Sequence, residues 1–297
     1  MGTGLLRRTL ALLGGSAIAF CALPGLAVAD DPLDAAAAAA RYVALGDSFA
    51  SGESVTPYDP ATNRAANQWH RSDRSYPKQL ANENPLEIAL VGFRACSGAT
   101  TPNITQVAQY ATQPPQIASF PTNVDIVSMS IGGNDIGFPD FAQACVMRQG
   151  CGGPTMVNAT LAKINGQLPG QLANTYASLR SAAGPTAEVF VLGYPQIVGA
   201  VRQGGGCSYL TGQERPIIRD VVAQLNGVIS QASAAAGFTY VDATTAGSPF
   251  LGHELCTRGS YFTNISSAFP FHPNLNGQGA YQDLLTRALR LAGFLPG

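Results

Sequence analysis

Residues 42–52 read YVALGDSFASG, a short apolar run that passes directly into small and polar residues. The run Tyr42–Leu45 predicts a buried strand, and Gly46-Asp47-Ser48 predicts a tight turn where that strand ends. Ser48 therefore stands at the carboxyl end of a strand between small neighbours, which suits a nucleophilic hydroxyl group. Taken alone, the same turn is equally compatible with a helix cap by Asp47 or Ser48.

Further short apolar runs predict strands over residues 87–93, 124–131, 188–192 and 238–241. The segments between them carry apolar residues at three-and-four spacing, which is typical of helices that pack on a sheet. These helical segments are residues 75–81, 104–120, 157–183, 213–236 and 276–292, with Pro114-Pro115 interrupting the second. The alternation predicts an α/β fold with a parallel sheet. Long loops are predicted at residues 52–72, 136–156, 199–212 and 243–273.

The composition points to a folded domain without a nucleic-acid partner. Of 297 residues, 46% are hydrophobic and 12% are charged, which argues against a disordered chain. The formal net charge is −1 and no run of like charge is present, so binding through phosphate contacts is not expected. The length suits one domain of the larger kind.

The N-terminus has the features of a secretory leader. Arg7 and Arg8 precede an apolar run over residues 9–26, and Ala27-Val28-Ala29 fits a cleavage site. We therefore expect residues 1–29 to be a signal peptide and residues 30–297 to be one secreted domain, without stable membrane insertion. An uncleaved anchor is the alternative, because an apolar run of about 18 residues is near the lower limit for a span. The adjacent arginines leave a twin-arginine export route open.

The cysteines agree with export, since oxidising compartments favour disulfides. Cys145 and Cys151 flank a short glycine-containing loop and are predicted to pair. Cys207 and Cys256 lie in glycine-rich loops and are predicted to form a second pair. Cys96 then remains a free thiol, because the number of cysteines after the leader is odd.

Hydrogen-bond donors follow the next two predicted strands. Gly98 lies in Cys96-Ser97-Gly98-Ala99-Thr100, and Asn134 lies in Gly132-Gly133-Asn134-Asp135. The carboxyl ends of parallel strands meet at one edge of the sheet, where ligand crevices form. The N–H groups of Ser48 and Gly98 and the Asn134 side chain could therefore stabilise the oxyanion of a tetrahedral intermediate.

Three histidines could act as the general base. We choose His272, because its loop before the last predicted helix can return over the first strand. His253 lies beside a predicted disulfide, which favours a structural or substrate-lining role, and His70 lies in an arginine-rich loop where we expect it to be solvated. The histidines are too scattered for a metal site, so no metal is predicted.

These four segments, in this order over residues 42 to about 290, resemble the blocks of the SGNH hydrolases, also called GDSL esterases and lipases, and in particular their secreted actinobacterial-type branch. The resemblance assigns Ser48 as nucleophile, Gly98 and Asn134 as oxyanion residues and His272 as base. It also implies a flavodoxin-like three-layer α/β/α sandwich with five parallel strands, and hydrolysis of carboxylic esters without a cofactor.

Two positions differ from the pattern of that family. Family members often have an aspartate three residues before the histidine, where this chain has Phe269. We expect the main-chain carbonyl of Phe269 or Pro270 to orient His272 instead, as in some members of this branch, which gives a weaker base. Trp69 occupies a position where a cysteine commonly pairs with the Cys96 block, so Cys96 stays unpaired. Cys96 as nucleophile is a further alternative.

The sequence thus predicts a secreted, monomeric serine ester hydrolase that forms an acyl-serine intermediate. Apolar residues in the loops suggest lipid-like acyl esters as substrates, although core packing explains some of them equally well; they are Phe138, Phe141, Phe250, Leu251, Tyr261, Phe262, Phe269 and Phe271. Acyl transfer to an alcohol and a non-catalytic binding protein are the alternatives. Asp242 is a second candidate for the acid.

Overall fold

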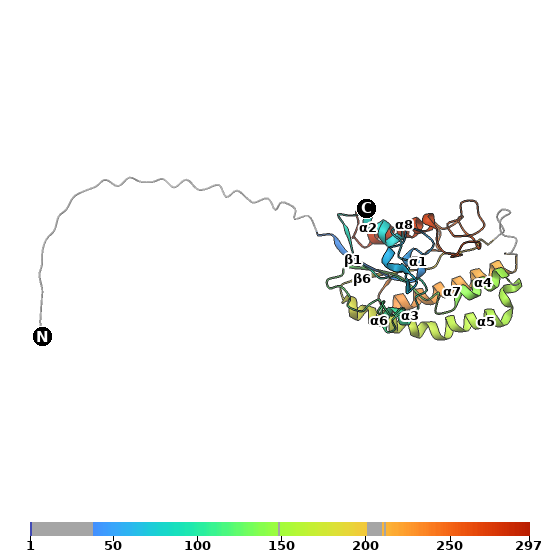
Figure 1. The fold of residues 1–297 in the computed structure, drawn as a ribbon, viewed down its shortest axis with the longest axis horizontal. Helices are drawn as coiled ribbons and strands as arrows, with labels where there is room; N and C mark the ends of the chain where they lie inside the picture. The colour runs from blue at the N-terminus through green and yellow to red at the C-terminus, as the bar shows by residue number, and fades with distance from the viewer. Residues whose placement is uncertain (2–37, 148, 201–209, 211) are drawn as a thin grey trace. The chain divides into compact units, whose positions relative to one another are not determined.

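The computed structural model describes Met1 and residues 38–147, 149–200, 210 and 212–297 (Figure 1). Residues Ala38–Gly297 form one compact unit. The predicted leader beyond Met1 and the predicted disulfide partner Cys207 lie outside the described residues. Within the described part of the chain, no helix is both long and apolar enough to cross a membrane.

The centre of the fold is a five-stranded parallel sheet in the order β4-β1-β5-β6-β7. The strands are β1 (Ala40–Gly46), β4 (Ile88–Phe93), β5 (Ile126–Ser130), β6 (Glu188–Leu192) and β7 (Thr239–Val241). All five predicted strands are confirmed. Counted along the chain, this order is 2-1-3-4-5, the flavodoxin-like arrangement. The central strands are buried on both faces, which explains their continuous apolar character.

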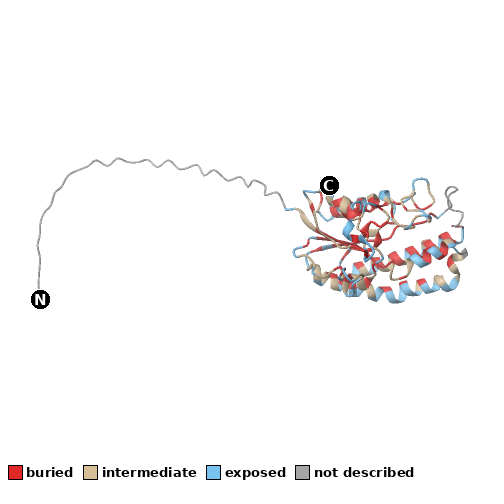
Figure 2. Cartoon of the chain, in the orientation of Figure 1, coloured by how far each residue is buried: buried red, intermediate tan, exposed pale blue. Residues whose placement is uncertain are grey.

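Two groups of helices cover the sheet and complete the predicted three-layer sandwich. Helix α2 (Tyr76–Glu83) packs on α8 (Leu275–Leu291), while α3 (Thr101–Thr105) and α7 (Glu214–Ala235) pack on α6 (Leu168–Ala183). Figure 1 shows these groups on opposite sides of the sheet. In Figure 2 the strands are buried and the outer sides of the lower helices are exposed. The remaining elements are α1 (Ser48–Ser51), η1 (Pro60–Thr62), β2 (Asn63–Arg64), β3 (Asn67–Gln68), α4 (Phe138–Met147), η2 (Gln149–Gly152), α5 (Pro154–Ala162) and the π-helical η3 (Lys163–Gln167).

One predicted helix and one predicted loop were wrong. The helix predicted over residues 104–120 ends at Thr105, because the following segment turns back and inserts Gln116 into the protein, where its amide binds both the N–H and the carbonyl of Gly46 at 2.8 Å. The loop predicted over residues 136–156 contains α4, whose Phe141, Ala142 and Cys145 are buried. Their spacing of one, three and four residues carried the helical signal.

The cysteines follow the predicted pattern as far as they are described. Cys145 and Cys151 form a disulfide. Cys256 is also disulfide-bonded, and its predicted partner lies outside the described residues. Cys96 is a buried free thiol, as predicted.

Candidate active site

The turn that carries Ser48 lies where the order of the sheet reverses, between β1 and β5. Asp47 caps α1 by accepting the Phe49 N–H at 3.0 Å, so Ser48 is the first residue of this single helical turn. The helix-cap interpretation of the turn is therefore correct for Asp47, and it places the Ser48 side chain beside the crevice. Gly46 has φ of 122°, and a Cβ there would lie 2.4 Å from the carbonyl oxygen of Ser130. The close approach of β1 and β5 at this point thus requires glycine.

A pocket of about 430 Å³ opens beside this turn, and it is lined by Ser48, Asn134 and His272. These three predicted site residues, far apart in the sequence, are brought together. Gly98, the other predicted oxyanion residue, does not line the pocket. The rest of the lining is largely apolar, with Phe138, Ala142, Val146 and Met147 from α4, Val222 and Leu225 from α7, and Ile265, Ala268, Phe269, Pro270 and Phe271 from the loop before His272.

The loop that carries Gly98 is nevertheless attached to Asn134. The Asn134 side-chain amide donates to the carbonyl of Ala99 at 2.9 Å. The neighbouring Asp135 carboxylate accepts the N–H of Thr101 at 3.0 Å and its hydroxyl at 2.6 Å. These bonds fix the loop after β4 against the loop after β5.

His272 is oriented by a main-chain carbonyl. Its Nδ1 lies 2.9 Å from the carbonyl oxygen of Pro270, and since a carbonyl only accepts, Nδ1 carries the proton. Nε2 is then left as the proton acceptor of the neutral ring. The Phe269 carbonyl accepts the hydroxyl of Thr263 at 2.6 Å. Pro270 therefore fits the orienting role better than Phe269.

The electrostatic surroundings keep His272 neutral. Burial lowers its pKa below the ordinary value of a histidine, while the negative charge of Glu53 and the carbonyls of Pro270 and Phe269 oppose this shift. A neutral imidazole is the form that can accept a proton from a serine hydroxyl. The ring of Phe49 lies against the imidazole, with the centroids 5.8 Å apart.

Asp47 connects the turn that carries Ser48 to the end of β5 and to the segment after β6. It accepts the Ser130 hydroxyl at 2.8 Å and the Tyr194 hydroxyl, and Tyr194 in turn accepts the N–H of Gly133 at 3.0 Å. Burial raises the pKa of Asp47 to about 6, although these hydrogen bonds lower it. Tyr194 was missed by sequence reasoning, although its position just after the strand over residues 188–192 was a usable signal.

The other candidates for catalytic groups lie outside the pocket. His70 was predicted to be solvated, which is wrong: it is buried, with Nδ1 2.6 Å from a carboxylate oxygen of Glu53. His253 stacks on Tyr261 with centroids 3.9 Å apart and binds the Gly259 carbonyl, consistent with a structural role. Asp242 accepts the N–H of Thr244.

Cys96 is unsuited to the role of nucleophile. Burial raises the pKa of its thiol to about 12, so the reactive thiolate is scarcely populated at neutral pH. In the described part of the chain, no three histidine, cysteine or acidic side chains are grouped in a way that could hold a metal ion.

The apolar residues singled out in the loops have three different environments. Phe138, Phe269 and Phe271 line the pocket, whereas Phe141, Phe250 and Phe262 belong to the core. Leu251 is exposed and Tyr261 stacks on His253. The apolar wall of the pocket also includes Val222 and Leu225, two buried residues of α7.

Comparison with known proteins agrees with this architecture. The model of the GDSL-like Lipase/Acylhydrolase family matches residues 44–280. Lipase 1 of Streptomyces coelicolor is 32% identical over 256 residues, which is 85% of this chain and 88% of that protein. A lipase of Streptomyces rimosus is 32% identical over 243 residues, covering 81% of this chain and 83% of the relative.

Solved structures agree as well. Phospholipase A1 from Streptomyces albidoflavus NA297 superposes with a TM-score of 0.70 at 32% identity, covering 84% of this chain and 99% of that one. The extracellular lipase of Streptomyces rimosus gives a TM-score of 0.71 at 32% identity and covers 84% and 100%. Since the family match and these relatives extend over most of the chain, the protein belongs to the GDSL-like lipase/acylhydrolase family and is a carboxylic ester hydrolase.

Proposed function

We propose that Ser48 is the nucleophile and His272 the general base of this ester hydrolase. The observation that carries the proposal is that both line one pocket, with Nδ1 of His272 bound to the Pro270 carbonyl and Nε2 left to accept a proton. Nε2 takes the proton of the Ser48 hydroxyl as its oxygen attacks the ester carbonyl carbon. The tetrahedral intermediate then expels the alcohol, which receives that proton from His272. Water, deprotonated by the same ring, then attacks the acyl-serine, and His272 returns that proton to the Ser48 oxygen as the acid leaves.

The negative oxygen of the intermediate is assigned to the N–H groups of Ser48 and Gly98 and the side chain of Asn134. Asn134 lines the pocket and is attached to the loop of Gly98 through Ala99, which supports this grouping. Each donor of this kind typically contributes ~3 to 4 kcal/mol to the transition state. A carbonyl stabilises the imidazolium less than a carboxylate would, so His272 acts as a comparatively weak base.

The substrate is assigned as a lipid-like acyl ester. The walls supplied by α4 and α7 are apolar and leave a cavity of about 430 Å³ beside Ser48, room for an acyl chain much longer than acetyl. Two relatives of similar fold are a phospholipase A1 and an extracellular lipase. We further assign residues 1–29 as a signal peptide and residues 30–297 as one catalytic domain that acts outside the cell as a monomer.

The test compares p-nitrophenyl ester hydrolysis by Ser48→Ala, His272→Ala and the control His253→Ala. The first two are expected to lose hydrolysis while keeping the wild-type circular dichroism spectrum, and the control is expected to keep both, since His253 lies outside the pocket. Labelling by a fluorophosphonate probe should require Ser48, because only an activated serine reacts. Retained turnover in Ser48→Ala or His272→Ala would refute the assignment. Rates measured from acetate to laurate esters test the acyl site, and a preference for acetate would contradict it.

A further inference from the structure

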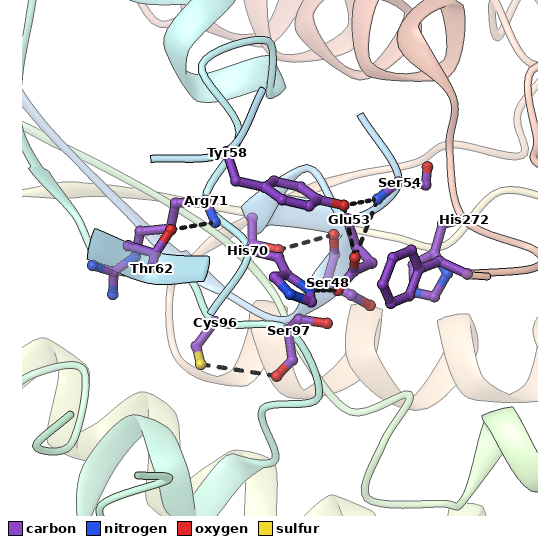
Figure 3. A network of polar contacts seen from close by, with 12 residues as sticks. Ser48, Glu53, Ser54, Tyr58, Thr62, His70, Arg71, Cys96, Ser97 and His272 are labelled. Atoms are coloured by element: carbon purple, nitrogen blue, oxygen red, sulfur yellow. Dashed lines mark hydrogen bonds and ion pairs between the residues drawn. The ribbon is translucent and has the colours of Figure 1, made fainter. Parts of the chain in front are cut away.

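A polar cluster of Glu53, His70 and Tyr58 lies next to the turn that carries Ser48 (Figure 3). Glu53 and His70 are 1% and 6% exposed, and Nδ1 of His70 lies 2.6 Å from Oε2 of Glu53. The Tyr58 hydroxyl donates to Oε1 of Glu53 at 2.9 Å, and the Tyr58 ring stacks on His70 with centroids 4.7 Å apart. None of the three lines the pocket, so the cluster does not contact a substrate bound there.

One side of the cluster is hydrogen-bonded to the turn that carries Ser48. The main-chain N–H of Glu53 donates to the carbonyl of Ser48 at 3.0 Å. Glu53 directly follows Gly52, which ends α1 in a left-handed conformation. A displacement of Glu53 would therefore be transmitted to Ser48.

The other side contacts the loop that carries His272. The ring of Phe269 meets the His70 ring edge to face, with centroids 5.3 Å apart and planes at 68°. The hydroxyl of Ser54, next to Glu53, donates to the carbonyl of Pro273 at 3.2 Å. The first contact lies immediately before Pro270 and the second immediately after His272. Together they hold both ends of the segment that carries the His272 ring.

This attachment matters because of the way in which His272 is oriented. Its ring direction depends on the carbonyl of Pro270, which lies in an irregular segment where Phe271 has a positive φ of 65°. The carbonyl can fix the direction of the imidazole only if the backbone around Pro270 is itself held in place. Stability alone does not account for two hydrogen-bonded polar groups buried at this place, since the cost of removing them from water offsets most of what their hydrogen bond contributes.

We propose that Glu53 and His70 are positioning residues of the active site: the Glu53 carboxylate holds the His70 ring, and that ring holds Phe269 and thereby the Pro270 carbonyl that aims His272 at Ser48. The inference rests on the proposed roles of Ser48 and His272. In this arrangement Phe269, at the place where relatives often carry an aspartate, orients the base indirectly through packing.

The key variant is His70→Asn. Asparagine keeps a side-chain donor for Glu53 and tolerates the φ of 47° at this position, but it lacks the ring that contacts Phe269. The matched control is His253→Asn, because His253 also uses Nδ1 on an oxygen and also stacks on a tyrosine, yet lies outside the pocket. We expect kcat for p-nitrophenyl acetate to fall about 10- to 100-fold in His70→Asn, since misplacement by about 1 Å has effects of this size. KM should stay within about threefold, and the control should keep wild-type kcat.

A double variant tests the route through Phe269. If His70 acts through that ring, His70→Asn should add less than about threefold to the loss caused by Phe269→Ala, as expected for residues that act as a unit. Full multiplication of the two losses would overturn the proposed route. Should His70→Asn fail to fold, Glu53→Gln in the same cycle with Phe269→Ala supplies the answer, with the same expected and overturning results.

Proton NMR of protein with ¹⁵N-labelled histidine gives a readout that general destabilisation would not move. The Nδ1 proton of His272, identified by its loss in His272→Ala, should be visible in the wild type and in His253→Asn. It should broaden or disappear in His70→Asn. If Ser48→Ala and His272→Ala are inactive while His70→Asn keeps both kcat and this signal, the proposed function stands and the positioning role is wrong. An active Ser48→Ala would instead overturn the function itself.

Discussion

Asp47 offers a quantitative test of the site, because it is a buried carboxyl group next to Ser48. It is 1% exposed and accepts hydrogen bonds from the Phe49 N–H and from the hydroxyls of Ser130 and Tyr194. Burial outweighs these bonds and raises its pKa from 3.8 to about 6. The perturbation is Asp47→Asn, which keeps a side-chain oxygen for the cap of α1 but cannot ionise.

The magnitude follows from linkage between protonation and folding. A pKa that is higher in the folded state means that the folded protein holds the proton more strongly. The corresponding stabilisation is fully present below pH 3.8 and is lost as the pH rises through about 6. A shift of roughly 2 units corresponds to about 3 kcal/mol. Of this, ~2 kcal/mol should be lost between about pH 4 and about pH 7.5.

The assay is urea unfolding of wild type and Asp47→Asn at a series of pH values across this range. The free energy of unfolding of the wild type, relative to the variant, should fall by ~2 kcal/mol from the acid to the neutral end. Asp283→Asn is the control, because Asp283 is exposed on α8, and its difference from wild type should change little. A difference between wild type and Asp47→Asn that is constant with pH would refute the reasoning about burial.

Three further variants test the fold and the pocket. Replacing both Cys145 and Cys151 by serine should lower the free energy of unfolding by ~2 kcal/mol, because the closed loop spans a separation of only 6 residues; an unchanged urea midpoint would contradict this. Ala142→Phe should fill part of the pocket next to its apolar wall and lower the laurate-to-acetate ratio of kcat/KM about tenfold or more. An unchanged ratio would mean that the acyl chain binds elsewhere. Gly46→Ala should cost more than ~4 kcal/mol, because its Cβ would lie 2.4 Å from the Ser130 carbonyl oxygen; a soluble variant with a wild-type thermal midpoint would show that the strands can separate.

The strands could be predicted because each is short, apolar and bounded by turn residues. A parallel strand that is buried on both faces is expected to show such a continuous apolar run. The segment after Thr105 could not, because what decides its path is the distant contact between Gln116 and both backbone groups of Gly46. A glutamine in an apolar-periodic stretch gives no sign that it will become a buried link to another strand.

The same distinction applies to the site. Ser48, Asn134 and His272 could be selected because each follows a predicted strand or precedes the last helix, and the rules of parallel sheets bring such positions to one edge. The interpretation of His70 failed because neighbouring arginines in the sequence suggested solvent. Its burial depends on Glu53, which lies 17 residues away, and no local pattern shows that the two side chains meet.

The absence of a carboxylate three residues before His272 is consistent with this buried environment. Nδ1 of His272 is already occupied by the Pro270 carbonyl, and the Phe269 side chain contacts His70 instead. A carboxylate at position 269 would therefore meet His70, whose Nδ1 is bound to Glu53, and would add a second negative charge near that carboxylate. Like charges in a buried site raise each other's cost of ionisation. An apolar ring at position 269, packed on His70, and the Pro270 carbonyl at Nδ1 of His272 thus fit together around the Glu53–His70 pair.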